Sequence, residues 1–383
     1  MLADCLQQRE VAQAFTAKLR DRPPRSSTLN ELVFGAHGND FVLSIEAELP
    51  ETIVSALLPS QSGPVQNNEQ RWLRFLRYEI RFEIFNDRQL VIGNEYLFLF
   101  SLSNQPERGG SRIYGETGRH RDWRFIVERD RQGEVNFRAE AHRTKKSRPA
   151  HVDGQMLALP KVQFESSADF PAARWFYDFL TTQCVFYRPD IDLLQTASPP
   201  GLSAELMLDA ANLPWLVLEL QKETDKFSAW VEHVKIALPQ VTSIRAKERE
   251  EDHHAYLAVA YNGGYEVTSS GLSEGTLRIL ALTILPYLTR RPAVIITEEP
   301  ENGIHPKAVE AVLQSLQSIY GSQVLISSHS PVVLAASKLD QVLCARLEAN
   351  GAASIVRGTE HPRLKEWHGQ IDLGSLLAAG VLG

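Results

Sequence analysis

The last third of the chain alternates short apolar segments with helical segments, and this pattern restricts the fold more than any other feature. The apolar segments are AVIIT at 293–297, QVLIS at 323–327 and DQVLCARL at 340–347. One helix is expected from Pro306 to near Gly321 and another from Pro331, since proline favours the first helical turn and glycine the position past the end. Apolar strands separated by helices predict an α/β fold with a largely parallel sheet buried on both faces.

Polar residues follow two of these strands directly. Glu298 and Glu299 come after the first strand, and Ser327, Ser328 and His329 end the second. Ligands of parallel α/β sheets bind at the carboxyl ends of the strands. Adjacent carboxylates at a strand end point apart, so one can face a magnesium ion while the other orients a water toward a γ-phosphate. A solvated acidic turn is the alternative for the acidic pair, and a structural histidine is the alternative for His329.

A third motif, GLSEGTLR at 271–278, precedes the apolar helical segment ILALTILPYL. Ser273 is placed to cap that helix, and Gly275 would let backbone approach a ligand closely. Free amides at a helix N-terminus attract anions. Helix capping alone would also explain this motif.

Together the three motifs resemble those of ABC-type ATPases of the AAA family. They are most similar to the stand-alone branch of SMC-like, RecF-like and OLD-like (AbiEii/OLD-type) proteins. GLSEGTLRILAL is similar to the signature motif, VIITEEPENGIHP to the Walker B motif with its D-loop, and LISSHSP to the switch-histidine segment. The resemblance implies a P-loop NTPase fold, an ABC-type ATPase head with an antiparallel β region and a helical insertion.

The resemblance also implies roles for single residues, with ATP and Mg²⁺ as cofactors. Glu298 takes the metal-side acidic position, Glu299 is the catalytic base, and His329 senses the γ-phosphate. Ser273 and Gly275 would contact the γ-phosphate of a nucleotide held by the opposite protomer of a head-to-tail homodimer, and the other residues expected to bind nucleotide are Leu272, Glu274 and Asn302.

Three segments are expected along the chain. Residues 1–167 form the remnant of an N-terminal ATPase lobe, in which 41–141 has the period-two pattern of an antiparallel sheet with one polar face and a turn at Gln132-Gly133. Residues 168–240 are predicted to form a helical insertion. Residues 241–383 form the C-terminal ATPase lobe, with a second hairpin turning at Asn262-Gly263-Gly264.

The phosphate-binding pattern GxxxxGK[ST] does not occur, and no lysine in the sequence follows a glycine. In the resembled family this loop opens the domain and Met1 matches the helix after it, so we expect an N-terminal truncation of roughly forty residues. The backbone nest and lysine of such a loop hold the phosphates. We therefore expect poor or no ATP binding by this chain.

Basic residues outnumber acidic ones by 12 to 7 between residues 104 and 149, including the run from His142 to Arg148. Such a strip could contact DNA phosphates. A solvated face of an antiparallel sheet is the favoured alternative. The net charge of −7 argues against a protein coated for nucleic acid.

The remaining composition is that of a protein without a membrane segment. No run of eighteen apolar residues occurs, and the N-terminus has acidic and polar residues where a secretory signal would be apolar, so its first twenty residues predict an amphipathic helix. Cys5, Cys184 and Cys344 lie far apart, which predicts neither disulfides nor a zinc site. A cytoplasmic location is expected.

Three functions are consistent with these features. The leading hypothesis is an ATP-driven dimeric switch in DNA repair, anti-phage defence or a toxin–antitoxin system. The alternative is a non-catalytic partner that completes the ATP site of another protomer. A third is an ATPase that regulates a separate nuclease or toxin, because the roughly fifty residues after His329 leave no room for a nuclease domain.

Overall fold

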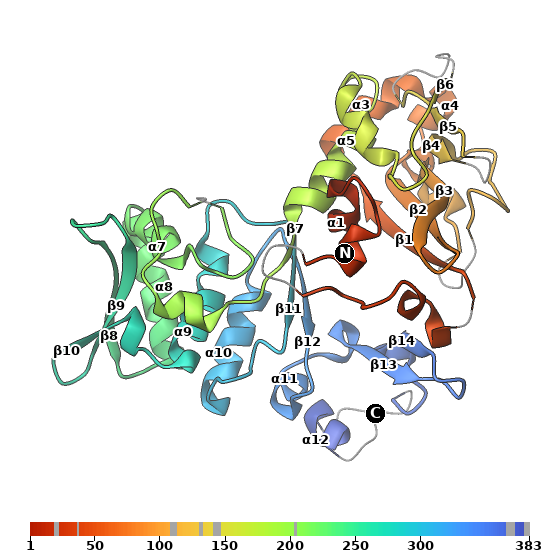
Figure 1. Cartoon of the computed structure of the whole chain (residues 1–383). Coiled ribbons are helices and arrows are strands. Elements are labelled where there is room, and N and C mark those ends of the chain that lie inside the picture. The colour runs from red at the N-terminus through yellow and green to blue at the C-terminus, as the bar shows by residue number, and fades with distance from the viewer. Residues whose placement is uncertain are drawn as a thin grey trace. The chain divides into compact units, whose positions relative to one another are not determined.

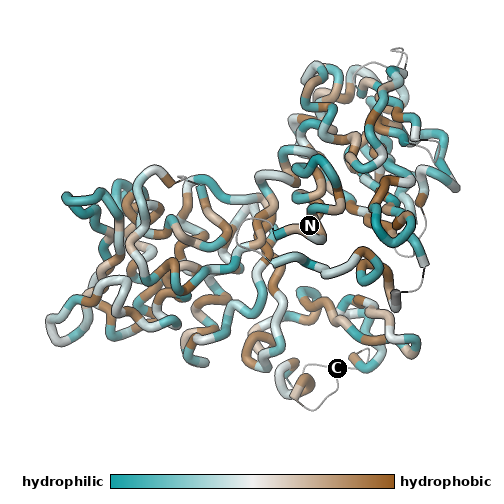
Figure 2. Tube along the Cα trace, viewed as in Figure 1, coloured by the Kyte–Doolittle hydropathy of each residue, from teal (hydrophilic) through white to brown (hydrophobic). Residues whose placement is uncertain are grey.

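The structure is a computed structural model that describes residues 1–18, 23–36, 38–107, 113–129, 133–140, 147–202, 205–364 and 372–378. The chain divides into two compact units, Met1–Thr181 and Thr182–Gly383. Figure 1 shows the elements of each unit, and Figure 2 shows hydrophobic segments inside both of them. The architecture is mixed α/β with several separate sheets.

The N-terminal unit is built on a six-stranded antiparallel sheet in the order β1-β2-β3-β4-β5-β6. Its strands are β1 (Asp40–Glu48), β2 (Phe75–Phe85), β3 (Gln89–Phe100), β4 (Arg124–Arg129), β5 (Val135–Phe137) and β6 (Arg148–Ala150). Its helices are α1 (Leu2–Gln7), α2 (Gln13–Thr16), α3 (Glu51–Leu57), α4 (Gly63–Gln66) and α5 (Pro171–Asp178). The predicted antiparallel region is confirmed, and β4 pairs with β5 as expected, although the turn residue Gln132 lies outside the described residues.

The expectation of one polar face is wrong for the central strands β2 and β3. Nearly every residue of β3 is buried, and the polar side chains of Arg77, Glu79, Asn94 and Glu95 are at most 5% exposed. Arg77 and Asn94 pair with other side chains of the sheet, whereas Glu79 and Glu95 bind backbone amides of segments outside it. The N-terminal helix also differs from the prediction, because it is broken into α1 and α2.

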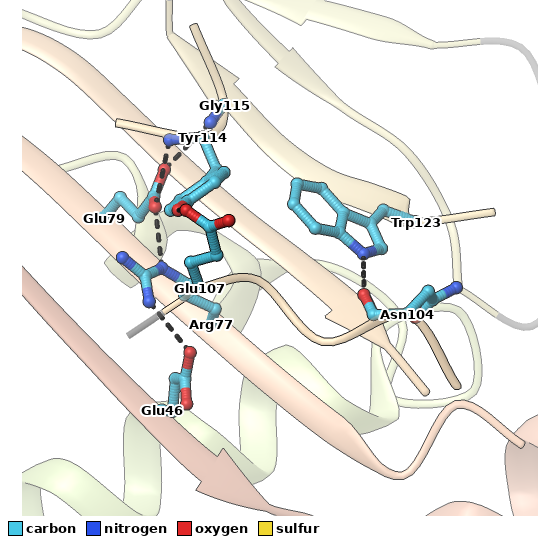
Figure 3. A network of polar contacts seen from close by, with 8 residues as sticks. All are labelled: Glu46, Arg77, Glu79, Asn104, Glu107, Tyr114, Gly115 and Trp123. Atoms are coloured by element: carbon cyan, nitrogen blue, oxygen red, sulfur yellow. Dashed lines mark hydrogen bonds and ion pairs between the residues drawn. The ribbon is translucent and has the colours of Figure 1, made fainter. Parts of the chain in front are cut away.

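Three fully buried glutamates each accept hydrogen bonds from two consecutive backbone N–H groups of a distant segment. Glu79 accepts from Tyr114 and Gly115, at 3.2 and 2.9 Å, and also from the Arg77 guanidinium at 2.7 Å (Figure 3). The other two carboxylates bind the amides of Ala158 and Leu159 (Glu95) and of Ala172 and Ala173 (Glu140). A buried polar group is stable only when it is hydrogen-bonded, so these three side chains fasten loops and the start of α5 to the segments that carry the glutamates.

The C-terminal unit contains the parallel sheet predicted for the last third, in the order β12-β11-β7. Its strands are β11 (Val294–Glu298), β12 (Gln323–Ser327) and β7 (Cys184–Phe186). β11 and β12 run parallel with Glu298 opposite Ser327, as expected. The strand β7 lies inside the segment expected to be helical.

Helices and a second sheet enclose this core. The helices are α6 (Ile191–Gln195), α7 (Leu213–Gln221), α8 (Thr224–Ala237), α9 (Glu274–Thr283), α10 (Pro306–Gln317), α11 (Pro331–Ala335) and α12 (Leu373–Ala378). The second sheet is antiparallel and consists of β8 (Val241–Glu248), β9 (Ala255–Tyr261) and β10 (Tyr265–Thr268). The hairpin between β9 and β10 turns at Gly263 and Gly264, both with positive φ, as predicted.

The segment 182–240 shares its hydrophobic core with the rest of the C-terminal unit. Val217, Trp230 and Val234 belong to the same buried cluster as Leu280 and Ile295. The two observed units therefore divide the chain differently from the three expected segments, because the helices α7 and α8 pack on the predicted ATPase core.

Two features of the last third differ from the prediction. β13 (Leu343–Leu347) does not join the parallel sheet but pairs antiparallel with β14 (Ala353–Arg357). β12 is the edge strand of its sheet, and Leu325 is 39% exposed, so burial on both faces is wrong for this strand. No helix in the described part of the chain is long and apolar enough to cross a membrane.

Candidate functional site

The carboxyl end of the parallel sheet brings together two of the three predicted motifs. Glu298 ends β11, and the Glu299 N–H donates to the Ser327 carbonyl at 2.8 Å, which extends the ladder one residue beyond the strand. His329 follows two residues later on the neighbouring chain segment and is exposed. The acidic pair and the histidine segment therefore leave the sheet side by side.

Glu298 and Glu299 have different surroundings, as expected for adjacent residues at a strand end. Glu298 is exposed, and within the described residues its carboxylate has no hydrogen-bond or ion-pair partner. Glu299 is partly buried and has a φ of +41°. A positive φ is unfavourable for a residue with a Cβ atom and is concentrated at functional sites.

Asn302 lies in the turn after the acidic pair and binds Glu299 twice. Its backbone N–H donates to the Glu299 carbonyl at 3.0 Å, and its side-chain amide donates to the Glu299 carboxylate. The sequence predicted Asn302 as a nucleotide contact. The structure shows its amide holding one oxygen of Glu299 in place.

The signature-like motif starts α9 in the way its sequence indicates. The Ser273 hydroxyl accepts a hydrogen bond from the Thr276 N–H at 3.3 Å and lies 2.9 Å from the Thr276 hydroxyl. Ser273 and Glu274 are exposed. Leu272 is 3% exposed and belongs to the hydrophobic core, so its side chain faces away from any ligand at this surface.

Gly275 joins this motif to the acidic turn. A Cβ atom on Gly275 would lie 2.5 Å from the Gly303 carbonyl oxygen, a distance that no real contact allows. Gly303 has a φ of +74° and follows Asn302 directly. The absence of a side chain at Gly275 thus lets the first turn of α9 contact the turn after β11, and the predicted signature and Walker B residues form one surface.

Sequence reasoning missed three contributions to this region. β7 was not recognised, and Tyr187, which follows it, donates from its N–H to Ile296 at 2.7 Å and from its hydroxyl to Ala281 at 2.9 Å, which ties the sheet to α9. The side-chain hydrogen bond between Glu301 and Ser328, which links the loops after β11 and β12, was also missed. The apolar CVFY segment before Pro189 was the available signal for the strand.

No metal cage is present at this site. In the described part of the chain, no three His, Cys, Asp or Glu side chains gather in a way that could hold a metal ion. A magnesium ion needs only one or two protein carboxylates when phosphate oxygens and waters complete its shell. The exposed Glu298 carboxylate fits that requirement.

The basic strip is largely engaged within its own unit wherever it is described. Arg119 and Arg138 both form ion pairs with Glu128, and Arg129 is fully buried against the carbonyls of Asp153 and Met156. The run 142–146 lies outside the described residues. DNA binding by residues 104–149 stays a prediction.

Comparison with known proteins identifies the family. Residues 79–335, more than half of the chain, match the family model described as "AAA domain, putative AbiEii toxin, Type IV TA system". The chain belongs to this family of AAA domains, as the motifs at the sheet edge predicted.

Solved structures give weaker similarities. The Smc head domain from Pyrococcus furiosus bound to the C-terminal domain of ScpA is 11% identical, with 79% of this chain and 85% of that chain covered and a TM-score of 0.35. The SMC head domain from Thermotoga maritima is 12% identical, with 69% and 74% covered and a TM-score of 0.29. No curated protein matches the chain.

Proposed function

We propose that the C-terminal unit provides the signature, Walker B and switch-histidine surface of an ATP-hydrolysing site in a nucleotide-driven dimeric switch. The observation that carries the proposal is the close approach of Gly275 to the Gly303 carbonyl, because it joins the start of α9 to the acidic turn at the carboxyl end of the parallel sheet. Family membership supports an ATPase.

Each residue of this surface has a role that its surroundings support. Glu298 has an exposed carboxylate, without a partner among the described residues, that could bind a magnesium ion to neutralise charge on the phosphates. Glu299, held by Asn302, accepts a proton from the attacking water or orients that water. His329 is exposed at the next strand end, where its ring can donate to a phosphate oxygen.

The exposed start of α9 fits a dimer better than a single chain. Ser273 and Glu274 face solvent, and free backbone amides at a helix N-terminus attract phosphate. In a head-to-tail homodimer this surface would complete a site on the second copy. We propose DNA repair or anti-phage defence as the setting, with a separate nuclease or toxin as a further partner.

Release of phosphate from Mg²⁺-ATP by the full chain tests the proposal. Glu299→Gln should lower the rate at least about a hundredfold, since that is a common contribution of general-base catalysis. Glu310→Gln, which changes an exposed glutamate on α10, is the matched control and should leave the rate unchanged. Equal and measurable rates for wild type and Glu299→Gln would refute the catalytic assignment, and no release by either would favour the second candidate function below.

A second candidate function is a non-catalytic partner that completes the ATP site of another protein. The observation in its favour is the exposed start of α9, where Ser273 and Glu274 face solvent and could complete a site on another protein. In that case equilibrium dialysis should detect no Mg²⁺-ATP binding to the chain alone. Hydrolysis by a partner ATPase should rise on mixing and be lost with Ser273→Arg, which blocks the start of α9.

A further inference from the structure

Glu301 is the acidic residue of the turn whose environment the proposed reaction does not explain. One carboxylate oxygen, Oε1, accepts a hydrogen bond from the Ser328 hydroxyl. The other, Oε2, is buried and has no hydrogen-bond partner within the described residues. Burying a carboxylate oxygen without a partner is unfavourable, so the position of this side chain is set by its one bond to Ser328.

Ser328 connects that bond to the segment that carries His329. Its hydroxyl donates to Glu301 and accepts from the Ser330 N–H at 3.0 Å. The Ser330 hydroxyl in turn accepts from the Val332 N–H at 3.2 Å and caps α11. The residues on both sides of His329 are therefore held, and Glu301 is their attachment to the turn after β11.

The turn after β11 and the segment after β12 are the Glu299 loop and the His329 loop. In the described structure, one backbone hydrogen bond connects them at the strand ends, from the Glu299 N–H to the Ser327 carbonyl. A single bond of this kind fixes the spacing of the strands but leaves the following residues free to rotate about it. The hydrogen bond between Ser328 and Glu301 adds a second point of attachment. Two points fix the orientation of one loop relative to the other.

We propose that Glu301 is a positioning residue that, through Ser328, holds the His329 loop in register with the Glu299 loop. This inference rests on the proposed function of the same site. Its reason is geometric, because a displacement of about 1 Å between reacting groups can lower a rate a hundredfold. Glu301 acts on the His329 loop through its hydrogen bond with Ser328.

The side chain of Glu301 sets the ranking of its variants. Glu301→Gln keeps an oxygen at the Oε1 position and the same length, so the bond to Ser328 can form without the charge that strengthens it. Glu301→Ala removes the acceptor, and Ser328→Ala removes the donor. Both alanine variants break this bond, and Ser328→Ala also removes the acceptor of the Ser330 N–H, so the double variant should be no worse than Ser328→Ala alone.

Kinetics of the full chain with Mg²⁺-ATP test this ranking. Glu301→Ala and Ser328→Ala should each lower kcat by about tenfold or more while KM stays unchanged. The double variant should match Ser328→Ala, and Glu301→Gln should recover most of the rate lost in Glu301→Ala. Ser337→Ala is the matched control, because its hydroxyl bonds only to the Val333 carbonyl in its own helix segment. Additive losses in the double variant, a change in KM alone, or no recovery with Gln would overturn the proposal.

Hydrogen exchange separates this inference from the proposed function. Loss of the bond in Glu301→Ala should raise amide exchange in 328–332 by at least about tenfold without changing exchange in β11, whether or not the chain hydrolyses ATP. Unchanged exchange in 328–332 would overturn the positioning role. Faster exchange in Glu301→Ala, in a chain that hydrolyses no ATP, would support the link between the loops and contradict only the proposed ATP hydrolysis.

Discussion

Glu299 shows at the scale of one residue how a site departs from ordinary backbone preferences. Its φ of +41° lies in the left-handed region of backbone conformation, which costs about 1–2 kcal/mol for a residue with a β-carbon. Hydrogen bonds from Asn302 and to Ser327 hold this conformation. The turn that results separates the direction of its carboxylate from that of Glu298.

Replacing Glu299 by glycine should therefore relieve strain. We expect Glu299→Gly to be more stable than Glu299→Ala by about 1 kcal/mol, measured as the free energy of unfolding in urea. The same pair of changes at Glu298, which ends an extended strand, is the control. There glycine should be the less stable variant, and the same order of stability at both positions would contradict the assignment of strain.

Glu140 makes the stability of the N-terminal unit depend on pH. Burial raises the pKa of its carboxyl to about 8, against hydrogen bonds from Ala173 and Ala172 that lower the pKa. The folded unit then keeps a proton that the unfolded chain, with an ordinary pKa near 4.5, has lost. Stability should fall as pH rises between these two values, by up to about 1.4 kcal/mol per pH unit for one linked proton.

Urea unfolding of this unit between pH 5 and pH 9 measures that effect. Glu140→Gln has no titratable group at position 140, so the dependence of its free energy of unfolding on pH should lack the contribution of Glu140. The difference in slope between wild type and variant is the quantity of interest. Equal slopes would show that Glu140 does not hold a proton in the folded unit.

The contact between α9 and the turn after β11 is the arrangement of elements on which the site depends. It requires glycine at position 275, because the nearest atom is a backbone oxygen that cannot rotate away. A side chain here would push the helix away from the acidic turn. The signature-like motif thus has a packing role that helix capping does not explain.

Gly275→Ala should separate these two elements. We expect a loss of about 1–3 kcal/mol in the free energy of unfolding, as for other overpacked sites, together with loss of any ATP hydrolysis. Gly63→Ala is the control, since a Cβ atom there would meet nothing within 4 Å. A Gly275→Ala variant as stable and active as the control would show that the contact is not required.

The sequence predicted structure within single elements better than it predicted contacts between elements. The apolar runs of β11 and β12 and the turn at Gly263 were found because period and turn chemistry depend on neighbouring residues. β7 was missed because three residues are too few to show a period. The pairing of β13 with β14 and the bond between Glu301 and Ser328 depend on residues far apart, on which a single sequence gives no direct information.

At the scale of the whole molecule, the chain consists of two compact units with separate hydrophobic clusters. Glu140 binds residues of α5 in the N-terminal unit, and Gly275 contacts Gly303 in the C-terminal unit. Stability changes at these two positions should therefore be local to their units.

Hydrogen exchange across the full chain tests this independence. Glu140→Ala leaves two helix amides without their acceptor, at a cost of about 1–3 kcal/mol, and should raise exchange within 1–181 only. Gly275→Ala should raise exchange within 182–383 only. Faster exchange in both units from either change would show that they unfold as one.

The three buried glutamates also have a consequence during synthesis of the chain. Glu79 precedes its amide partners by 35 and 36 residues, and Glu95 precedes its own by 63 and 64. The partners of Glu140 come last, at Ala172 and Ala173. A nascent chain at the ribosome therefore carries acids that have nothing to bind for several seconds, at ordinary rates of translation. The three glutamates therefore acquire their partners in the order Glu79, Glu95, Glu140, and the last of these contacts can form only after the start of α5 has been synthesised.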